Sequence, residues 1–268
     1  MSWEDGELAG FDLETTGVNV NQDRVVTGCV FHVPALDERG HREPPTIYSW
    51  LADPGIEIPT DASDVHGITT EHAREHGAPA DEVLEDMMEI LASFMSRGVP
   101  IVGANLQYDF TLLDRDARRH GLAPLSHTTL EGGPAPVIDI MVIDRAIDPY
   151  RKGGRKLGML AEYYGVPLGD DAHDSTADAR AATRIAWKLA RLGRRKPTGE
   201  PLGDSIEGRG RVIDVGAMKL RDLHVKQVEW KAKQAAGLAD WLRKKGENAD
   251  DVRPEWPFIP LESDGKLF

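Results

Sequence analysis

The sequence contains a single cysteine, Cys29, among its 268 residues, so it cannot form an internal disulfide. A lone thiol fits a reducing compartment. No apolar run approaches the roughly 20 residues that a membrane-spanning helix needs, so we expect no membrane partner. The first residues are acidic and lack the basic and apolar regions of a secretory signal. Together these absences predict a cytoplasmic protein.

Positive charge is scarce in most of the chain. Residues 1–190 hold 32 acids and 16 Lys or Arg, a net charge of −16, whereas residues 191–268 hold 13 acids and 16 Lys or Arg, a net charge of +3. Non-specific affinity for duplex nucleic acid comes mainly from cations that neutralise phosphates. The first part is therefore a poor match for a long duplex. If it handles a polyanion, we expect metal ions to mediate or the contact to be short.

Hydrophobic periodicity predicts a mixed α/β domain. Strands are expected where apolar residues alternate or β-branched residues gather, over 8–14, 25–33, 46–51, 98–103 and 136–141. Helices are expected where apolar residues recur at helical spacing, over 80–95, 108–120, 155–164, 175–192 and 218–245, with a shorter one within 61–77. Three strands followed by alternating helices and strands indicate a mixed sheet covered by helices.

The end of the chain differs in composition. Residues 193–218 are rich in Gly, Arg and Pro, which predicts a linker or mobile loop. Residues 219–268 are expected to form a C-terminal helical extension. The apolar segment 256–260 is predicted to dock on the rest of the protein.

Acidic side chains occur where strands end and helices begin. Asp12 and Glu14 lie two residues apart in a predicted strand, so their side chains leave the same face. Asp109 opens a helix, and His173 and Asp178 flank the start of another. Grouped carboxylates repel one another unless a cation joins them, and Mg²⁺ prefers carboxylates, water and phosphate as ligands. Two such ions about 4 Å apart can clamp the attacking and leaving oxygens of a phosphoryl transfer.

Four segments, in order, resemble the motifs of the DEDDh (DnaQ-like) 3′–5′ exonucleases, the group that includes the proofreading subunit of bacterial DNA polymerase III. They are Asp12-Leu13-Glu14-Thr15-Thr16-Gly17, Val65-His66-Gly67-Ile68-Thr69, Asn105-Leu106-Gln107-Tyr108-Asp109 and His173-Asp174-Ser175-Thr176-Ala177-Asp178-Ala179. A strand that reads Asp-x-Glu is a weak signal alone, whereas four elements in this order and spacing are specific. The resemblance covers about residues 7–192.

The resemblance implies an RNase H-like mixed five-stranded sheet flanked by helices, so that residues 1–192 form the exonuclease domain. It implies two Mg²⁺ or Mn²⁺ ions and hydrolysis that releases nucleoside 5′-monophosphates from a single-stranded 3′ end, with DNA as the expected nucleic acid. The residues to which it gives roles are Asp12, Glu14, Asp109 and Asp178 as metal ligands, His173 as general base, and Leu13, Thr15, Thr16 and His66 as neighbours of the terminal nucleotide.

Several residues also permit plainer interpretations. Ser175 and Asp178 have the spacing of a capping box. His72 and His76 are four apart on a predicted helix, but no third metal ligand is evident, which favours an exposed helical face. Cys29 is expected in the core.

Other residues have both a structural and a nucleic-acid interpretation. Asp139 is expected in an apolar strand near the site, as a supporting residue and not a ligand. The basic segment 151–156 is either a solvated loop or a phosphate contact. Trp230 and Trp241 are expected to pack, although they could stack on bases.

Two other functions remain open. The motifs do not separate DNA from RNA, so an RNA-directed exoribonuclease of the same superfamily is one alternative. A non-catalytic module that binds nucleic acid or a polymerase is the other, and the intact set of four acids and one histidine argues against it. A DNA polymerase is a candidate partner of the protein.

Overall fold

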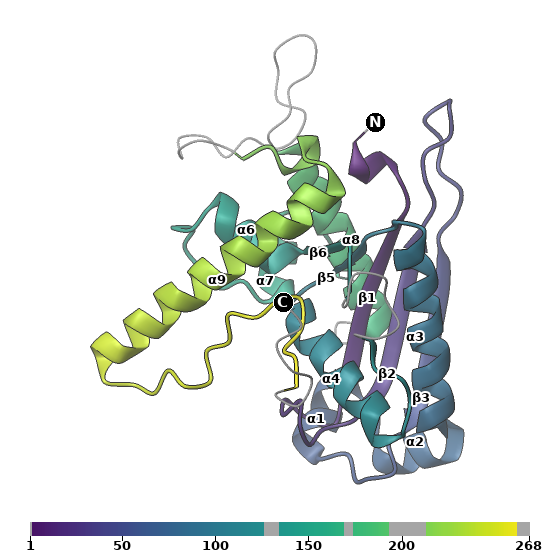
Figure 1. The fold of residues 1–268 in the computed structure, drawn as a ribbon. Coiled ribbons are helices and arrows are strands. Elements are labelled where there is room, and N and C mark those ends of the chain that lie inside the picture. Colours follow the sequence, from purple (N-terminus) through teal and green to yellow (C-terminus); the bar gives the residue numbers. More distant parts are fainter. Residues whose placement is uncertain (1, 126–133, 169–173, 193–212, 262–268) are drawn as a thin grey trace.

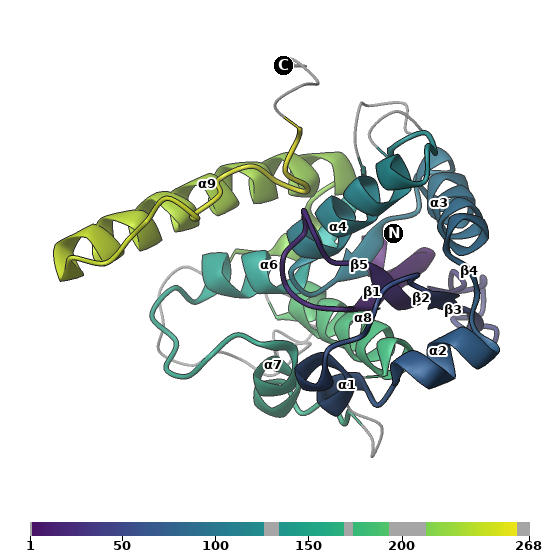
Figure 2. The ribbon, with the colours of Figure 1, turned by 90° about the horizontal axis from the view of Figure 1, so that it is seen from below.

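The computed structural model describes residues 2–125, 134–168, 174–192 and 213–261. Its centre is a six-stranded sheet in the order β4-β3-β2-β1-β5-β6 (Figure 1; β4 is labelled in Figure 2). The strands are β1 (Leu8–Thr15), β2 (Val25–Val33), β3 (Thr46–Asp53), β4 (Ala78–Pro79), β5 (Ile101–Gly103) and β6 (Val137–Asp139). The α-helices are α1 (Thr60–His66), α2 (Thr70–His76), α3 (Ala80–Ser96), α4 (Leu106–Arg119), α6 (Ile140–Ile147), α7 (Leu157–Tyr163), α8 (Ser175–Arg191) and α9 (Leu220–Lys245), and short 3₁₀ helices cover Trp3–Asp5 and Val215–Ala217.

The strand directions bring three loops to one edge of the sheet. Strand β2 is antiparallel to both β1 and β3, whereas β5 is parallel to β1 and β6 is parallel to β5. The carboxyl ends of β1, β5 and β6 therefore lie at the same end of the sheet, where the strands stop. The mixed sheet predicted from the sequence is confirmed, but the count of five strands is wrong. The sixth strand, β4, has only two residues, too few to produce an alternating pattern.

Helices cover both faces of the sheet. Helices α3 and α4 lie on one face, and α8 lies on the other (Figure 2). The helical spacing predicted for residues 80–95 is confirmed, because the apolar side chains on one side of α3 are buried. They include Val83, Leu84, Met87, Leu91 and Phe94. Among the described residues, no helix combines the length and the apolar character needed to cross a bilayer.

Helix α8 approaches β1 very closely at Gly10. A Cβ atom added to Gly10 would collide with Thr183 Oγ1 and would lie 2.5 Å from the carbonyl oxygen of Ala179. Only glycine therefore permits this contact. Because side chains alternate along a strand, residues 10, 12 and 14 share the face that α8 covers. The missing side chain of Gly10 thus sets how near α8 comes to the two acids of β1.

The strand predicted over 136–141 ends earlier than expected. Strand β6 stops at Asp139, and α6, which was not predicted, begins at Ile140. Asp139 caps this helix by accepting hydrogen bonds from the backbone N–H groups of Met141 and Val142, at 2.9 and 3.4 Å. The apolar run continues through both elements, so its periodicity does not mark the boundary.

The predicted C-terminal helix is confirmed as α9, and it covers the exposed edge of the sheet. Gln227 accepts a hydrogen bond from the backbone N–H of Asp139 at 2.7 Å and donates one to the carbonyl of Val137 at 2.8 Å. It thereby occupies backbone groups that an edge strand would otherwise leave open.

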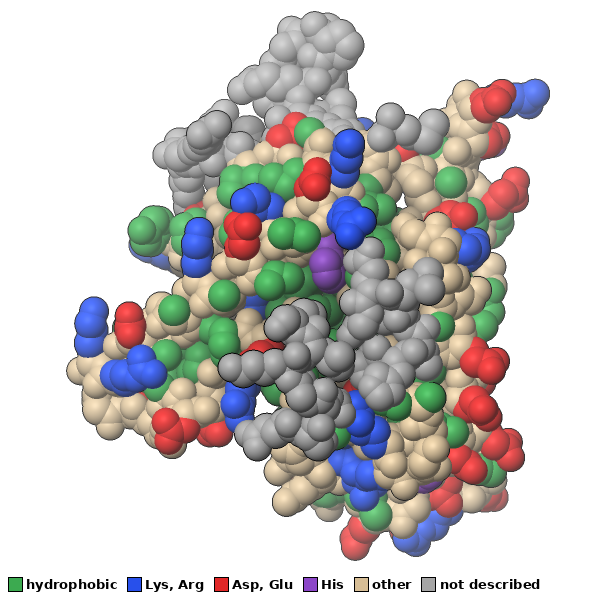
Figure 3. Space-filling model, in the orientation of Figure 1, with side chains coloured by type: hydrophobic (Ala, Val, Ile, Leu, Met, Phe, Trp, Pro, Cys, Tyr) green, Lys and Arg blue, Asp and Glu red, His purple; other side chains and the backbone are tan. Residues whose placement is uncertain are grey.

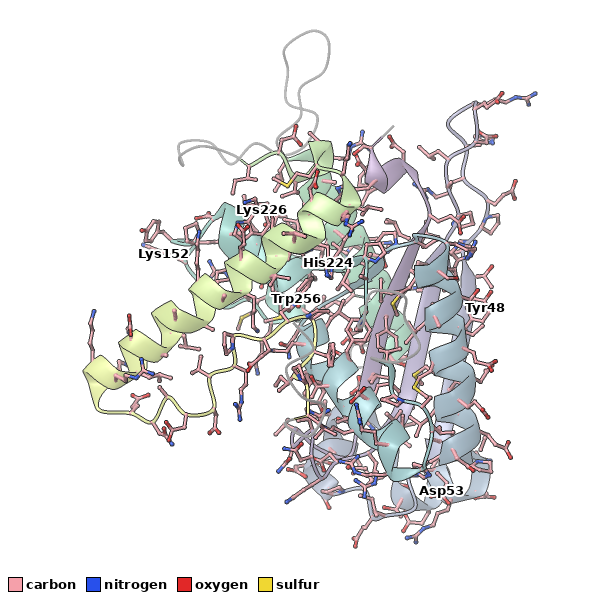
Figure 4. The ribbon with its side chains drawn as sticks, viewed as in Figure 1. Tyr48, Asp53, Lys152, His224, Lys226 and Trp256 are labelled. Carbon is pink, nitrogen blue, oxygen red and sulfur yellow. The ribbon has the colours of Figure 1, made fainter. Side chains whose placement is uncertain are left out.

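The tail after α9 docks, as its composition predicts. Trp256 is buried beside His224 with ring centroids 5.0 Å apart (Figure 4). Arg115 of α4 donates to the carbonyl of Ile259 at 2.7 Å. Most of the predicted linker, residues 193–212, lies outside the described residues, but Val215 is buried and accepts a hydrogen bond from Trp3 Nε1 at 2.9 Å.

Replacing Gly10 by alanine tests the close contact of α8 with β1. We expect Gly10→Ala to lower the free energy of unfolding by about 1–3 kcal/mol, because the new methyl group must displace α8. Urea unfolding measures this change. Gly237→Ala in α9 is the control, since its Cβ would meet nothing within 4 Å, and it should be neutral or stabilise by up to about 1 kcal/mol. Equal stability of Gly10→Ala and the parent protein would contradict the packing argument.

Candidate active site

Three carboxylates meet at the carboxyl end of β1. Asp12 and Glu14 leave the face of β1 that α8 covers, and Asp178 comes from the first turn of α8. Each offers an oxygen atom, and these atoms lie within 4.8 Å of one another. Among the described residues, this is the one group of three or more His, Cys, Asp or Glu side chains placed to share a metal ion.

Asp109 joins this group from the opposite face of the sheet. It lies in the first turn of α4, is buried, and accepts a hydrogen bond from the backbone N–H of Leu13 at 3.2 Å. Leu13 stands between Asp12 and Glu14, so this bond ties Asp109 to the strand that carries them. The structure therefore brings together all four acids that the resemblance names.

Burial and neighbouring carboxylates raise the pKa of Asp12, Glu14 and Asp109. Burial raises the pKa of Asp12 well above its ordinary value, and the charges of Asp109, Asp178 and Glu14 raise it further. Burial, followed by repulsion from Asp178 and Asp109, raises the pKa of Glu14 to about 8. Burial likewise raises the pKa of Asp109 to about 8, against the opposing effect of the hydrogen bond from Leu13. Such a cluster holds protons at neutral pH unless a cation neutralises it.

Asp139 supports the site by fixing the start of α4. Its carboxylate accepts hydrogen bonds from the backbone N–H groups of Asn105 and Leu106, at 3.2 and 3.1 Å. It also accepts one from Trp256 Nε1 at 3.4 Å. Asn105 has a left-handed backbone with φ of 66°, which turns the chain from β5 into the helix that carries Asp109. Sequence reasoning expected Asp139 nearby but did not predict that it would cap two helices.

The side chains expected beside the terminal nucleotide have distinct environments. Leu13 is buried in the core, and buried Thr16 donates a hydrogen bond to Asp23 at 3.0 Å. Thr15 is partly exposed, and its hydroxyl lies 2.6 Å from the hydroxyl of Tyr108. Tyr108 therefore braces the end of β1, a role for which the sequence gives no signal beyond its place in the second motif.

His66 lies at the end of α1, next to β1. Its Nδ1 accepts a hydrogen bond from the backbone N–H of Ile68 at 3.1 Å. Its Nε2 is buried and makes no hydrogen bond to any residue in the described ranges. Burial lowers the pKa of His66, and the nearby backbone of Thr15 opposes this shift. His66 thus combines contact with the β1 terminus and an open hydrogen-bonding atom.

The structure decides between two readings of the start of α8. Asp174 is the N-cap, and its carboxylate accepts a hydrogen bond from the backbone N–H of Thr176 at 2.9 Å. Ser175 is already inside the helix, so the capping-box interpretation of Ser175 and Asp178 is wrong. Asp178 instead joins the acidic cluster. His173, the expected general base, lies outside the described residues.

Other candidates turn out to be structural. His72 and His76 are exposed, and their rings contact each other at a tilt of 59° with centroids 4.7 Å apart. Cys29 is buried, as expected. In the basic segment 151–156, Arg151 and Arg155 form ion pairs with buried Asp144 at 3.0 and 2.8 Å, so these two side chains brace the loop.

Known sequences match the part of the chain that contains this site. The chain is 28% identical over 186 residues to the PolC-type DNA polymerase III of Lacticaseibacillus paracasei, which covers 68% of this chain and 11% of the polymerase. It is 26% identical over 182 residues to the PolC-type polymerase of Clostridium perfringens, again over 68% of this chain and 11% of the polymerase. The chain thus matches about a tenth of the length of these relatives.

Solved structures share the fold. Escherichia coli Exonuclease I in complex with a dT13 oligonucleotide superposes with a TM-score of 0.54 at 18% identity, over 69% of this chain and 41% of that one. A moderately thermophilic Exonuclease I from Methylocaldum szegediense gives a TM-score of 0.52 at 21% identity, over 68% and 40% of the two chains.

The family resemblance seen in the four motifs is confirmed. The RNase_T model, described as exonuclease, matches residues 9–186 and thus spans β1 through most of α8. This segment includes Asp12, Glu14, Asp109 and Asp178. Because the match covers about two thirds of the 268 residues, the chain belongs to the RNase_T exonuclease family.

Proposed function

We propose that this exonuclease removes nucleotides from the 3′ end of single-stranded DNA and releases nucleoside 5′-monophosphates, in proofreading or repair. The observation that carries the proposal is the meeting of Asp12, Glu14 and Asp178 within 4.8 Å at the carboxyl end of β1. The matched polymerases and the Exonuclease I bound to dT13 support DNA as the substrate. A frayed single strand also suits a domain whose first 190 residues carry a net charge of −16.

The donor set fits hard divalent cations. The side chains that gather here are carboxylates, which Mg²⁺ and Mn²⁺ prefer over softer ligands. Their raised pKa values mean that a cation would compete with protons and stabilise the ionised cluster. We assign Asp12, Glu14, Asp109 and Asp178 as the ligands of two Mg²⁺ or Mn²⁺ ions.

Different residues of the chain position the acids, contact the terminal nucleotide and transfer the proton. Bound divalent ions supply stabilisation for the charge that develops on the scissile phosphate. Asp109 is held in place by the N–H of Leu13, and Tyr108 steadies Thr15 beside the terminal nucleotide. His66, whose buried Nε2 makes no hydrogen bond to any described residue, lies beside the backbone of Thr15 at the same terminus. We assign His173 as the general base that takes the proton of the attacking water.

We further propose that residues 1–192 form the catalytic domain and that residues 219–268 extend it. Gln227 accepts a hydrogen bond from the backbone N–H of Asp139, and Trp256 donates one to its carboxylate, which supports an extension that is integral to the site. Because the matched relatives are DNA polymerases, we propose a DNA polymerase as a partner.

Asp12→Ala tests the nuclease directly. With Mg²⁺ and a single-stranded DNA labelled at its 5′ end, we expect stepwise shortening from the 3′ end by the parent protein. The variant should be at least about 100-fold slower, the size typical when one electrostatic stabiliser of a transition state is removed. EDTA should abolish the reaction. The control is Asp81→Ala, an exposed acid at the start of α3. Faster cleavage of a matched RNA would favour the exoribonuclease alternative, and no cleavage of either would favour a binding module.

His173→Ala separates proton transfer from metal binding. We expect turnover to fall by about 10²–10⁴-fold, the usual contribution of a general base. The Mn²⁺ affinity, measured by titration calorimetry, should stay within about twofold of the parent value. The acidic limb of the plot of kcat against pH should vanish in the variant. Parallel losses of turnover and Mn²⁺ affinity would show that His173 serves the metal site instead.

The raised pKa values predict how stability depends on pH. Between about pH 5 and 8 the folded metal-free protein binds protons that the unfolded chain has released, because Glu14 and Asp109 have pKa values near 8 when folded. Stability should therefore fall as pH rises through this window. Thermal unfolding in EDTA should show a Tm lower by several degrees at pH 8 than at pH 5.5. Mg²⁺ should flatten this slope, and a slope unchanged by Mg²⁺ would argue against metal at these acids.

A further inference from the structure

A second candidate site lies between α6 and α9, away from the acidic cluster. It is a pocket of about 720 Å³ between the end of α6, the loop that follows it and the middle of α9. Its main side chains are aromatic, apolar or positively charged: Arg145, Tyr150, Trp230, Lys233, Leu238 and Trp241. Among the described residues that line it, none is acidic. This composition differs from that of the catalytic domain as a whole.

Two of the three aromatic side chains of the pocket are at least half exposed to solvent. Tyr150 is 91% exposed and Trp241 is 50% exposed, although large aromatic side chains normally bury much of their surface. The ammonium group of Lys245 lies 3.8 Å from the centroid of the Trp241 ring. Sequence reasoning expected both tryptophans to pack. Trp230 is partly buried and does so, but Trp241 does not.

Positive charge gathers on the same helix. Helix α9 contains seven Lys or Arg and three Asp or Glu, a net charge of +4 in a protein of net charge −13. In the space-filling view, hydrophobic, Lys and Arg side chains lie over α9 together with a few acidic ones, and many Asp and Glu side chains line the opposite edge of the molecule over α3 (Figure 3). In the pocket, the side chains of Arg145 and Lys233 are exposed. Partial burial lowers the pKa of Arg145, and the positive charge of the nearby Arg155 lowers it further.

The pocket is adjacent to the catalytic edge of the sheet. Lys231 of α9 interacts with Asp139, which in turn lies close enough to raise the pKa of Asp109. Arg145 follows Asp139 by six residues along α6, which is about 9 Å at the rise of an α-helix. Gln234 joins the two helices by donating to the carbonyl of Val142 at 2.9 Å. A strand that ends at the acidic cluster can therefore reach the pocket within a few nucleotides.

We propose that this pocket binds the single strand upstream of its 3′ end, with bases stacked on Tyr150 and Trp241 and phosphates paired with Arg145 and Lys233. Open aromatic faces beside cations are the recurring means of holding single strands without sequence preference. The proposal rests on the proposed function. The α9 side of the pocket lies beyond residue 186, outside the family match, so this chain adds the site to the family's domain.

The observations favour a nucleic acid over a protein at this pocket. An apolar peptide would use Leu238 and Trp241 but would gain little from the two cations, whereas phosphates need them. A single strand is thus the occupant that uses both the rings and the charges of the pocket.

The double variant Trp241→Ala/Lys233→Glu tests the proposal through the dependence on strand length. For a DNA strand of 20 nucleotides we expect KM to rise about tenfold, which is about 1.4 kcal/mol and within the range for one lost stacked base. For a trinucleotide of the same 3′ sequence, KM should stay within about twofold, and kcat should be unchanged for both. The slope of log affinity against log salt should also become shallower by about 1.

Matched controls make the result specific. Trp187→Ala removes another exposed tryptophan, and Lys219→Glu makes the same charge change just before α9, both outside the pocket. Neither should alter the length dependence. Tyr150→Ala, at a side chain 91% exposed, gives a second test that cannot be lost to misfolding.

The outcomes separate this proposal from the proposed function. Equal effects of the double variant on the long strand and the trinucleotide would overturn the pocket while leaving the nuclease intact. If the parent protein cleaved nothing, fluorescence anisotropy of labelled (dT)20 would still decide. Unchanged affinity of the double variant and of Tyr150→Ala would then overturn the proposal, and weakened binding would support it.

Discussion

The close packing of α8 against β1 at Gly10 is the constraint on which the site depends. Asp12 and Glu14 project from the face that α8 covers, and Asp178 can reach them only because no side chain at Gly10 holds the helix away. Three carboxylates within 4.8 Å repel one another, so packing must hold them together. The buried alanines of α8 and the core beneath it supply that packing. A cation bound among these carboxylates relieves their repulsion and supplies positive charge for the reaction.

Much of this arrangement could be predicted from the sequence, because the acids lie at fixed offsets within strongly patterned elements. Asp12 and Glu14 alternate along β1, and Asp109 and Asp178 open predicted helices. The parts that could not be predicted depend on tertiary contacts. A two-residue β4 has no periodicity, and the apolar run across Asp139 hides the change from strand to helix. The N-cap of α8 is Asp174, one position before Ser175, the residue that the capping-box spacing indicated.

Asp139 shows how the C-terminal extension becomes part of the site. One carboxylate caps both α4 and α6, while Gln227 binds its backbone N–H and Trp256 its side chain. Burial raises the pKa of Asp139, and Lys231 of α9 opposes this effect by favouring the charged form. Residues from the last fifth of the chain therefore hold in place a group that orients Asp109, and one of them favours its charged form.

This linkage gives a physical reason why the pocket lies where it does. The same helix that closes the edge of β6 through Gln227 carries Lys231 toward Asp139 and Lys233 toward the pocket. A domain whose own surface is acidic cannot attract a polyanion over a wide area, but a basic helix fixed at the rim of its site can supply cations locally. The extension thus brings positive charge to a domain rich in acids, and its hydrogen bonds to Asp139 fix the proposed binding surface beside the acidic cluster.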